Sequence, residues 1–249
     1  MGVPEDESVL MREAQPPDRV VAYGSHPDQV ADVRFGDERS RDRPLVLIFH
    51  GGFWRPRYDR AHTGPMAAAI ADAGWIVASV EYRRVPGDPD ATLDDASAAL
   101  ALLPASIEGH DGRVVLIGHS AGGHLVLWLA SARATPELAG VLALAPAADL
   151  RLAHAMDLGD GAVLAFLGAD PAARSDADPR RLRSASIPVT IVQGDRDEIV
   201  PGAVAASYAH AHRATQLTRV NAGHYGPIDP LSPVWPAVLA ELKELSRTR

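Results

Sequence analysis

Short, continuous apolar runs recur along the chain from residue 45 onward. They occupy residues 45–49, 75–80, 114–117, 141–145 and 189–192. Runs of this kind, apolar on both faces, are typical of the central strands of a parallel sheet. They therefore predict a series of buried strands, and residues 217–220 are predicted as the last of them.

Two earlier runs have a different pattern. Residues 19–23 and 29–35 partly alternate between apolar and polar positions, and the turn-forming sequence Gly24-Ser25-His26-Pro27 separates them. Alternation around such a turn is typical of a hairpin. The two runs are predicted to form an antiparallel edge of the sheet.

Stretches of helix length lie between and after the buried runs. They cover residues 59–73, 92–103, 121–132, 202–213 and 235–245, and Pro104 is predicted to end the second of them. Alternating strands and helices imply right-handed crossovers. The fold class predicted is α/β, with a mostly parallel, doubly wound sheet of about eight strands.

The pattern predicts one domain over residues 19–249, preceded by a flexible arm. Residues 1–18 are acidic, contain three prolines and offer few apolar side chains to bury. Residues 147–184 interrupt the alternation, and we interpret them as a small cap insertion over the site. The alternative is a surface excursion with no role in binding.

Composition narrows the classes of partner. The net charge is −8, the basic residues are scattered, and there is no cysteine. Nucleic acid is therefore not an expected partner, and disulfides and thiolate metal sites are excluded. The sequence has no signal-peptide apolar segment and no run of about 18 apolar residues. We expect a cytoplasmic protein without membrane contact that acts on a small-molecule substrate, and a homodimer is compatible with the sequence.

The motif Gly118-His119-Ser120-Ala121-Gly122 follows one predicted strand directly and precedes an apolar helix. This is the context of the Gly-x-Ser-x-Gly nucleophile elbow, in which a sharp turn exposes the serine. Glycines let neighbouring backbone approach the strained residue. Ser120 is the predicted nucleophile. The alternative is that Ser120 only caps the following helix.

A second motif, His50-Gly51-Gly52-Phe53-Trp54, follows the strand predicted at 45–49. Esterases carry an oxyanion-hole loop of the His-Gly-Gly type at this position. Backbone N–H groups of Gly52 or Phe53, together with that of Ala121, are predicted to bind a developing oxyanion. The alternative is an ordinary glycine turn.

Serine needs a base that removes its hydroxyl proton. In proteins with the Gly-x-Ser-x-Gly elbow, an acidic residue and then a histidine follow the serine along the chain. Asp197, at the apex of the loop after the strand predicted at 189–192, is the predicted acid, with Asp195 as competitor. His224, in a glycine-rich loop after the last strand, is the predicted base. His210 and His212 are the alternatives, but an exposed polar face of the helix at 202–213 accounts for both.

No metal and no cofactor are predicted. The sequence contains no His-Glu-x-x-His motif and no paired-carboxylate cluster of ligand type. His119 is predicted to pack beside the elbow or line the pocket. His62 is expected at the surface.

Residues 20–245 resemble the α/β-hydrolase superfamily. The loop at 50–54, the sequence Glu81-Tyr82-Arg83 and the elbow are similar to those of arylformamidase (kynurenine formamidase)-like and carboxylesterase-like serine hydrolases. The resemblance implies acylation of Ser120 and then hydrolysis by water that His224 activates. Trp54, His119 and Tyr225 are candidate pocket residues, and ordinary packing is the alternative for the two aromatic ones.

Three functions remain open at this point. The first is hydrolysis of small carboxylic esters by a Ser-His-Asp acyl-enzyme mechanism, and the second is hydrolysis of N-formyl aryl amides such as N-formylkynurenine. The third is a non-catalytic ligand receptor, since a fold alone does not establish activity. The complete set of Ser120, Asp197 and His224 argues against the receptor.

Overall fold

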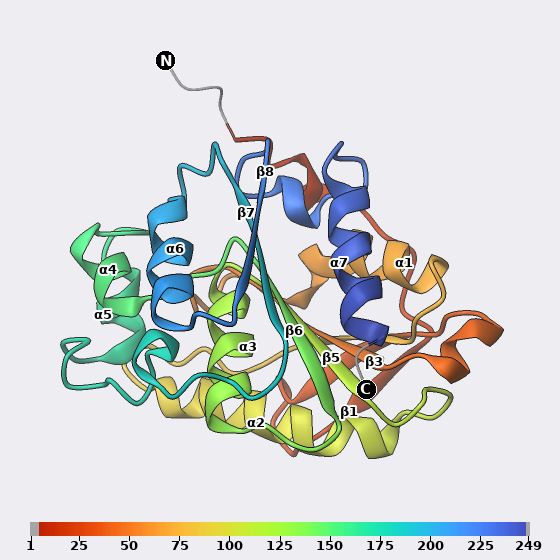
Figure 1. Cartoon of the computed structure of the whole chain (residues 1–249). Helices are drawn as coiled ribbons and strands as arrows, with labels where there is room; N and C mark the ends of the chain where they lie inside the picture. Colours follow the sequence, from red (N-terminus) through yellow and green to blue (C-terminus); the bar gives the residue numbers. More distant parts are fainter. Residues whose placement is uncertain (1–4, 248–249) are drawn as a thin grey trace.

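One sheet runs through the centre of the protein, and helices cover both of its faces (Figure 1). The computed structural model describes residues 5–247. Within that range the sheet has eight strands in the order β1-β2-β4-β3-β5-β6-β7-β8. The strands are β1 (Arg19–Ala22), β2 (Val30–Arg34), β3 (Leu45–Phe49), β4 (Val77–Val80), β5 (Val114–His119), β6 (Leu138–Leu144), β7 (Val189–Gly194) and β8 (Gln216–Val220).

The strand directions confirm the predicted sheet. β2 pairs antiparallel with β1 and with β4, so the first two strands form the expected hairpin at one edge. From β4 to β8 every pair is parallel. The carboxyl ends of β3, β5, β7 and β8 therefore lie at one edge of the sheet, where loops from distant parts of the chain meet.

Helices α1 and α7 pack on one face of the sheet, and α2, α3 and α6 lie on the other (Figure 1). The helices are α1 (Gly64–Asp72), α2 (Pro89–Ser106), α3 (Ala121–Ala132), α4 (Leu150–Ala155), α5 (Ala162–Leu167), α6 (Gly202–Ala211) and α7 (Trp235–Arg247). Short 3-10 turns are η1 (Ser8–Met11), η2 (Glu38–Asp42), η3 (Arg60–Thr63), η4 (Pro179–Arg181) and η5 (Gly226–Ile228).

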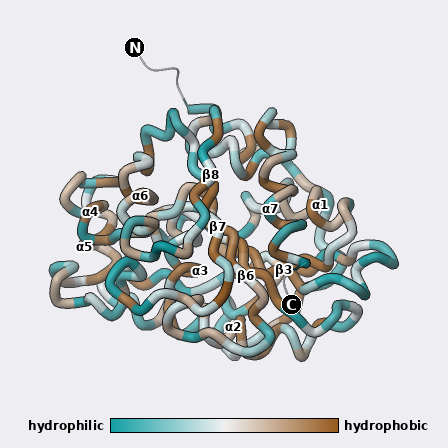
Figure 2. The backbone as a smooth tube through the Cα atoms, viewed as in Figure 1, coloured by the Kyte–Doolittle hydropathy of each residue, from teal (hydrophilic) through white to brown (hydrophobic). Residues whose placement is uncertain are grey.

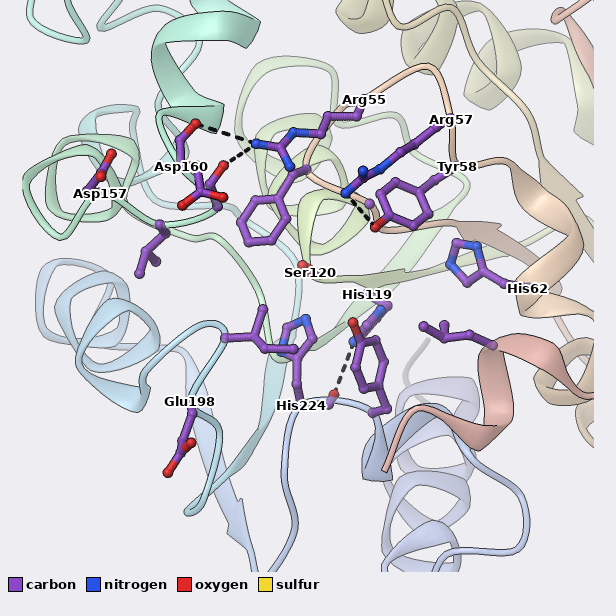
Figure 3. A pocket seen from close by; sticks show the side chains of 17 residues that line it. Arg55, Arg57, Tyr58, His62, His119, Ser120, Asp157, Asp160, Glu198 and His224 are labelled. Atoms are coloured by element: carbon purple, nitrogen blue, oxygen red, sulfur yellow. Dashed lines mark hydrogen bonds between the residues drawn. The ribbon is translucent and has the colours of Figure 1, made fainter. Parts of the chain in front are cut away.

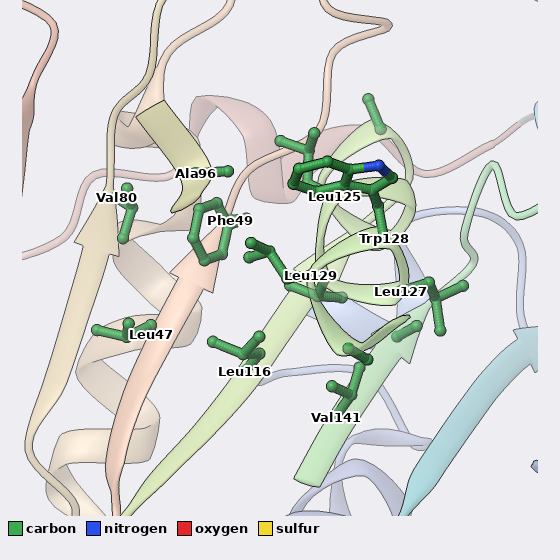
Figure 4. Packing of buried hydrophobic residues seen from close by; sticks show 14 of the residues in the cluster. Leu47, Phe49, Val80, Ala96, Leu116, Leu125, Leu127, Trp128, Leu129 and Val141 are labelled. Atoms are coloured by element: carbon green, nitrogen blue, oxygen red, sulfur yellow. The ribbon is translucent and has the colours of Figure 1, made fainter. Parts of the chain in front are cut away.

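β3 shows why the apolar runs are continuous. The central strands are hydrophobic in Figure 2. Leu45, Leu47 and Phe49 pack into the cluster under α2 and α3, in which Figure 4 shows Leu47 and Phe49. Val46 and Ile48 pack into the cluster under α1 and α7. Successive side chains of a strand point to opposite faces. A strand covered on both faces therefore needs an apolar residue at every position, and each such side chain contributes about 1.5–3 kcal/mol when fully buried.

Two differences between the predicted and observed helix bounds have a clear physical reason. α2 continues past Pro104 to Ser106. Proline near the end of a helix removes one backbone hydrogen bond and leaves the earlier turns intact, which is why the helix does not stop at Leu103. The helix predicted at 59–73 divides into η3 and α1 at Gly64 and Pro65, since proline is favoured in a first turn.

Residues 5–18 differ from the expectation of a segment with little structure. Residues 1–4 lie outside the described residues, but η1 begins at Ser8 and the Val9 side chain is 1% exposed. Val9 packs into the apolar cluster on the α1 and α7 face, and Arg12 forms an ion pair with Asp229. This segment therefore packs against the domain.

Between residues 5 and 247, no helix combines the length and the apolar character that a membrane crossing requires.

Candidate active site

Ser120 stands at the sharp turn between β5 and α3. Its backbone has φ 56° and ψ −114°, an unfavourable conformation for a residue with a side chain. Close backbone contacts hold the turn: a Cβ on Gly122 would lie 2.0 Å from the carbonyl oxygen of Phe49, and one on Gly118 would lie 2.1 Å from that of Gly122. The glycines at these positions therefore permit the turn.

His224 and Asp197 come together from neighbouring loops. His224 follows β8, Asp197 follows β7, and the His224 Nδ1 atom lies 2.8 Å from Asp197 Oδ2. The other carboxylate oxygen accepts hydrogen bonds from the backbone N–H groups of Ile199 at 3.0 Å and Val200 at 2.7 Å. Because Asp197 is buried, these bonds fix the position of its carboxylate.

The three competing residues lie elsewhere. Asp195 is exposed and its carboxylate accepts a hydrogen bond from Arg219 at 3.2 Å. His210 is exposed on α6, as expected. For His212 the expectation of an exposed polar face is wrong, because its ring is buried, stacks on Tyr208 at 4.2 Å and donates to the Pro179 carbonyl.

The loop after β3 has an unusual backbone. Gly52, Phe53 and Trp54 have φ values of 109°, 52° and 54°. Positive φ is unfavourable for Phe and Trp, and strain of this kind concentrates at functional sites. The backbone N–H groups of Gly52 and Phe53 bond to no other described residue. Ala121 is the first residue of α3, so its N–H has no acceptor within the helix.

His50, the first residue after β3, supports this loop through hydrogen bonds. Burial lowers its pKa to about 3, so the ring is neutral and carries one N–H. Nδ1 lies 2.8 Å from the Gly51 carbonyl oxygen. Nε2 lies 3.1 Å from the Arg84 guanidinium and 3.1 Å from a Glu81 carboxylate oxygen. The Tyr82 hydroxyl donates a further bond to the His50 carbonyl at 2.7 Å, so both the ring and the backbone of His50 are held.

His119 lies behind Ser120 and His224. Its Nε2 donates to the His224 carbonyl at 3.1 Å, and the two ring centroids are 4.6 Å apart. Burial, with a smaller contribution from His224, lowers the pKa of His119 well below its usual value. A neutral His119 thus supports the backbone of the His224 loop without adding a positive charge beside it.

A cavity of about 420 Å³ opens above Ser120 (Figure 3). Most of the predicted site residues border it directly: Gly52, Phe53, His119, Ser120, His224 and Tyr225. Asp197 lies behind His224, and Ala121 is buried beside Ser120. Trp54 does not border the cavity; its ring is buried in the core and stacks on Phe166 with centroids 4.6 Å apart.

Several cavity residues were not predicted. Leu10, Arg55, Arg57, Tyr58 and His62 form part of its lining. His62, expected at the surface, is partly buried with its ring 5.6 Å from that of His50. The short spacing of residues 55–62 from the His-Gly-Gly motif was an available signal, but no local pattern distinguished these side chains from an ordinary loop.

Residues 157–160, within the segment interpreted as a cap, also border the cavity. Arg55 donates hydrogen bonds to the carbonyls of Gly159 and Asp160, and its guanidinium lies 5.9 Å from the Phe53 ring centroid (Figure 3). Arg55 therefore connects the loop after β3 to the 157–160 segment across the cavity.

Residues 5–247 contain no cluster of three or more potential ligands, His or carboxylate, arranged to hold a metal ion.

The buried histidines predict a loss of stability in mild acid. Burial lowers the pKa of His124 to about 4 and that of His50 to about 3. Below about pH 6.5 the unfolded chain binds protons that these folded rings do not, so stability is complete above that pH and falls as the pH approaches 4. Each ring contributes a slope of about 1.4 kcal/mol per pH unit.

Urea unfolding between pH 7 and pH 4.5 measures this slope. His124→Gln keeps a donor for the Ala177 carbonyl. We expect this variant to reduce the slope of the free energy of unfolding against pH by about 1.4 kcal/mol per pH unit, the contribution of one ring. The exposed Ser25, changed to Ala, serves as control and should leave the slope unchanged, because its hydroxyl does not titrate in this pH range. A free energy of unfolding that is constant over this range would contradict the prediction.

Comparisons with known proteins agree with the architecture. Residues 46–192 match the family described as the α/β-hydrolase fold. Kynurenine formamidase of Danio rerio is 31% identical over 112 residues, covering 45% of this chain and 38% of the relative. Esterase LipC of Mycobacterium tuberculosis is 26% identical over 249 aligned residues, covering 83% of this chain and 59% of the relative. The chain thus matches less than two thirds of the length of either relative.

Among solved structures, esterase B of Lactobacillus rhamnosis, inhibited by a tributyrin phosphonate, superposes with a TM-score of 0.77 at 20% identity. The superposition covers 97% of this chain and 90% of that one. Such a likeness shows the fold. Together with the family match over more than half of the sequence, it establishes that this chain belongs to the α/β-hydrolase family.

Proposed function

We propose that this protein is a serine hydrolase that cleaves small carboxylic esters through a covalent acyl-enzyme. One observation carries the proposal: His224, paired with the buried Asp197 at 2.8 Å, borders the same cavity as the strained Ser120. Nucleophile, base and acid thus come from three loops at one edge of the sheet. The names of esterase LipC and of esterase B support the same chemistry.

In the acylation step, Ser120 Oγ attacks the ester carbonyl carbon while its proton passes to His224 Nε2. Asp197 holds the hydrogen on Nδ1 and stabilises the imidazolium that forms. When the tetrahedral intermediate collapses, the bond to the leaving oxygen breaks and His224 returns the proton to the departing alcohol. Ser120 then carries the acyl group.

Deacylation repeats these steps with water as the nucleophile. His224 takes a proton from the water, the hydroxide adds to the acyl carbon, and collapse releases the carboxylic acid and Ser120. In both halves the negative charge develops on the carbonyl oxygen. The N–H groups of Gly52, Phe53 and Ala121 are the donors that we assign to it, and loss of one such donor typically costs about 10²–10³ in kcat.

The second candidate is hydrolysis of N-formyl aryl amides. It is favoured by the His50-Gly51-Gly52-Phe53-Trp54 motif, and a relative named kynurenine formamidase supports it. Phe53, Tyr58 and Tyr225 border the cavity and offer aromatic faces to an aryl leaving group. Trp54, which lies in the core, is not part of this proposal.

Two measurements test the proposal and separate the candidates. Intact-protein mass spectrometry after treatment with an organophosphonate should give one adduct, on Ser120. Rates of p-nitrophenyl acetate and N-formylkynurenine hydrolysis then decide the substrate class. Fast ester turnover without deformylation identifies an esterase, and a strong preference for deformylation identifies an arylformamidase. Absence of both adduct and turnover would favour the non-catalytic receptor.

A further inference from the structure

The N-terminal segment reaches into the site through Glu5. One carboxylate oxygen accepts a hydrogen bond from the backbone N–H of His224 at 2.8 Å. The other accepts from the backbone N–H of Glu198, the residue after Asp197, at 3.3 Å. A single carboxylate therefore joins the loop that carries the proposed base to the loop that carries the proposed acid.

The start of the His224 loop is held by Arg196, whose backbone N–H donates to the Ala222 carbonyl at 3.0 Å and whose guanidinium donates to the Asn221 carbonyl at 3.2 Å. His224 itself has three hydrogen bonds to other described residues. The loop lies between β8 and η5, outside the regular pairing of the sheet. The side chain of His224 is held by Asp197, and its carbonyl accepts from His119 at 3.1 Å. Its N–H is the group that Glu5 binds. Removal of the Glu5 carboxylate would therefore break one of the three hydrogen bonds that hold His224 in place relative to Ser120.

The neighbouring sequence leaves room for this carboxylate. A Cβ on Gly223 would lie 2.0 Å from Glu5 Oε2, so any side chain at this position would displace Glu5. Val9, 1% exposed, and the ion pair of Arg12 with Asp229 anchor the rest of the segment. Leu10 borders the cavity itself. Separate contacts thus place residues 5–12 beside the site.

We propose that the segment of residues 5–12 contributes to the active site and that Glu5, on this segment, is a positioning residue for His224. This inference rests on the proposed function, because it assigns a role in the orientation of the base. Glu5 does not touch substrate. It restricts the His224 loop, so that the imidazole is held in line for the Ser120 proton before substrate arrives.

The test uses the full chain and two readouts. Glu5→Ala should lower kcat for p-nitrophenyl acetate about tenfold, with KM changed less than twofold, since the contact acts on the base and not on substrate binding. Hydrogen exchange in the peptide over residues 221–226 should become faster. Glu5→Gln should restore most of both, because its amide oxygen can still accept the His224 N–H.

Glu13→Ala is the matched control. Glu13 is exposed, directly follows this segment and forms no hydrogen bond or ion pair with another described residue, so its removal should alter neither readout. Gly223→Ala should reproduce the Glu5→Ala effects, and the double variant should show little additional loss.

The outcomes separate this inference from the proposed function. Unchanged exchange at residues 221–226 in Glu5→Ala would overturn the inference, as would a kcat loss that Glu5→Gln does not relieve. If the wild-type protein hydrolyses neither ester nor formyl amide, the hydrolase assignment is rejected. Faster exchange in Glu5→Ala would then still support the contact between Glu5 and the His224 loop.

Discussion

Replacement of Ser120 with alanine is expected to lower kcat for ester hydrolysis by about 10⁶ and to abolish labelling by an organophosphonate. The physical reason is that acylation needs Oγ, and a water in the same cavity lacks its fixed position between His224 and the assigned N–H donors. Some rate above that in water, about 10³-fold or more, should survive through those donors and through substrate binding. Steady-state kinetics measure the loss.

The control for this variant is Ser106→Ala. Ser106 is the last residue of α2 and does not border the cavity, and among residues 5–247 its hydroxyl bonds only to the Leu102 carbonyl one turn earlier. It should keep the wild-type rate and the adduct. Turnover by Ser120→Ala within tenfold of wild type would show that the reaction does not pass through this serine, and the acyl-enzyme proposal would fail.

The sheet could be predicted from the sequence because burial on both faces leaves few alternatives. A strand such as β3, with Val46 and Ile48 facing one apolar cluster and Leu47 the other, reads as an unbroken apolar run. Motifs that depend on local geometry were equally visible. The elbow around Ser120 needs glycine at positions where two backbone segments touch. These positions lie within the five consecutive residues 118–122, so a local motif reveals them.

Features set by contacts between distant residues could not be read in the same way. Val9 begins an apolar run of three residues in an acidic stretch, and its burial depends on a cluster formed by α1 and α7 far along the chain. Trp54 differs from Phe53 by one position, yet the first stacks on Phe166 in the core and the second borders the cavity. The positive φ values at residues 52–54 set the directions of the two side chains. These backbone angles cannot be predicted from the amino-acid composition of the loop.

His212 and the segment of residues 157–160 illustrate the same limit. A histidine on a helix is usually exposed, but His212 follows the end of α6 and meets the Pro179 carbonyl, a contact with the 147–184 insertion. The insertion was recognised because it interrupts the strand and helix pattern. Which of its residues reach the cavity depends on tertiary contacts such as that of Arg55 with the Gly159 carbonyl.

Asp197→Asn is expected to leave the fold intact and to lower kcat by roughly 10⁴, if the penalty known for serine proteases carries over. Oδ1 accepts the N–H groups of Ile199 and Val200, so the asparagine oxygen should remain there. The amide nitrogen then takes the place of Oδ2, which faces Nδ1 of His224. A donor at this point forces His224 to carry its hydrogen on Nε2, where it can no longer accept the Ser120 proton.

The structure also explains why this variant should fold. Oδ2 accepts a hydrogen bond from the Gln193 side-chain nitrogen at 3.0 Å, and the same nitrogen donates to the carbonyls of Val200 at 3.2 Å and Gly194 at 3.3 Å. In the variant this nitrogen loses Oδ2 as an acceptor but keeps the two carbonyls, so it is not left without a partner. Asp195→Asn is the matched control, because Asp195 is exposed and its carboxylate contacts Arg219 instead of His224. If Asp197→Asn costs less than tenfold while Asp195→Asn disables turnover, the acid is Asp195.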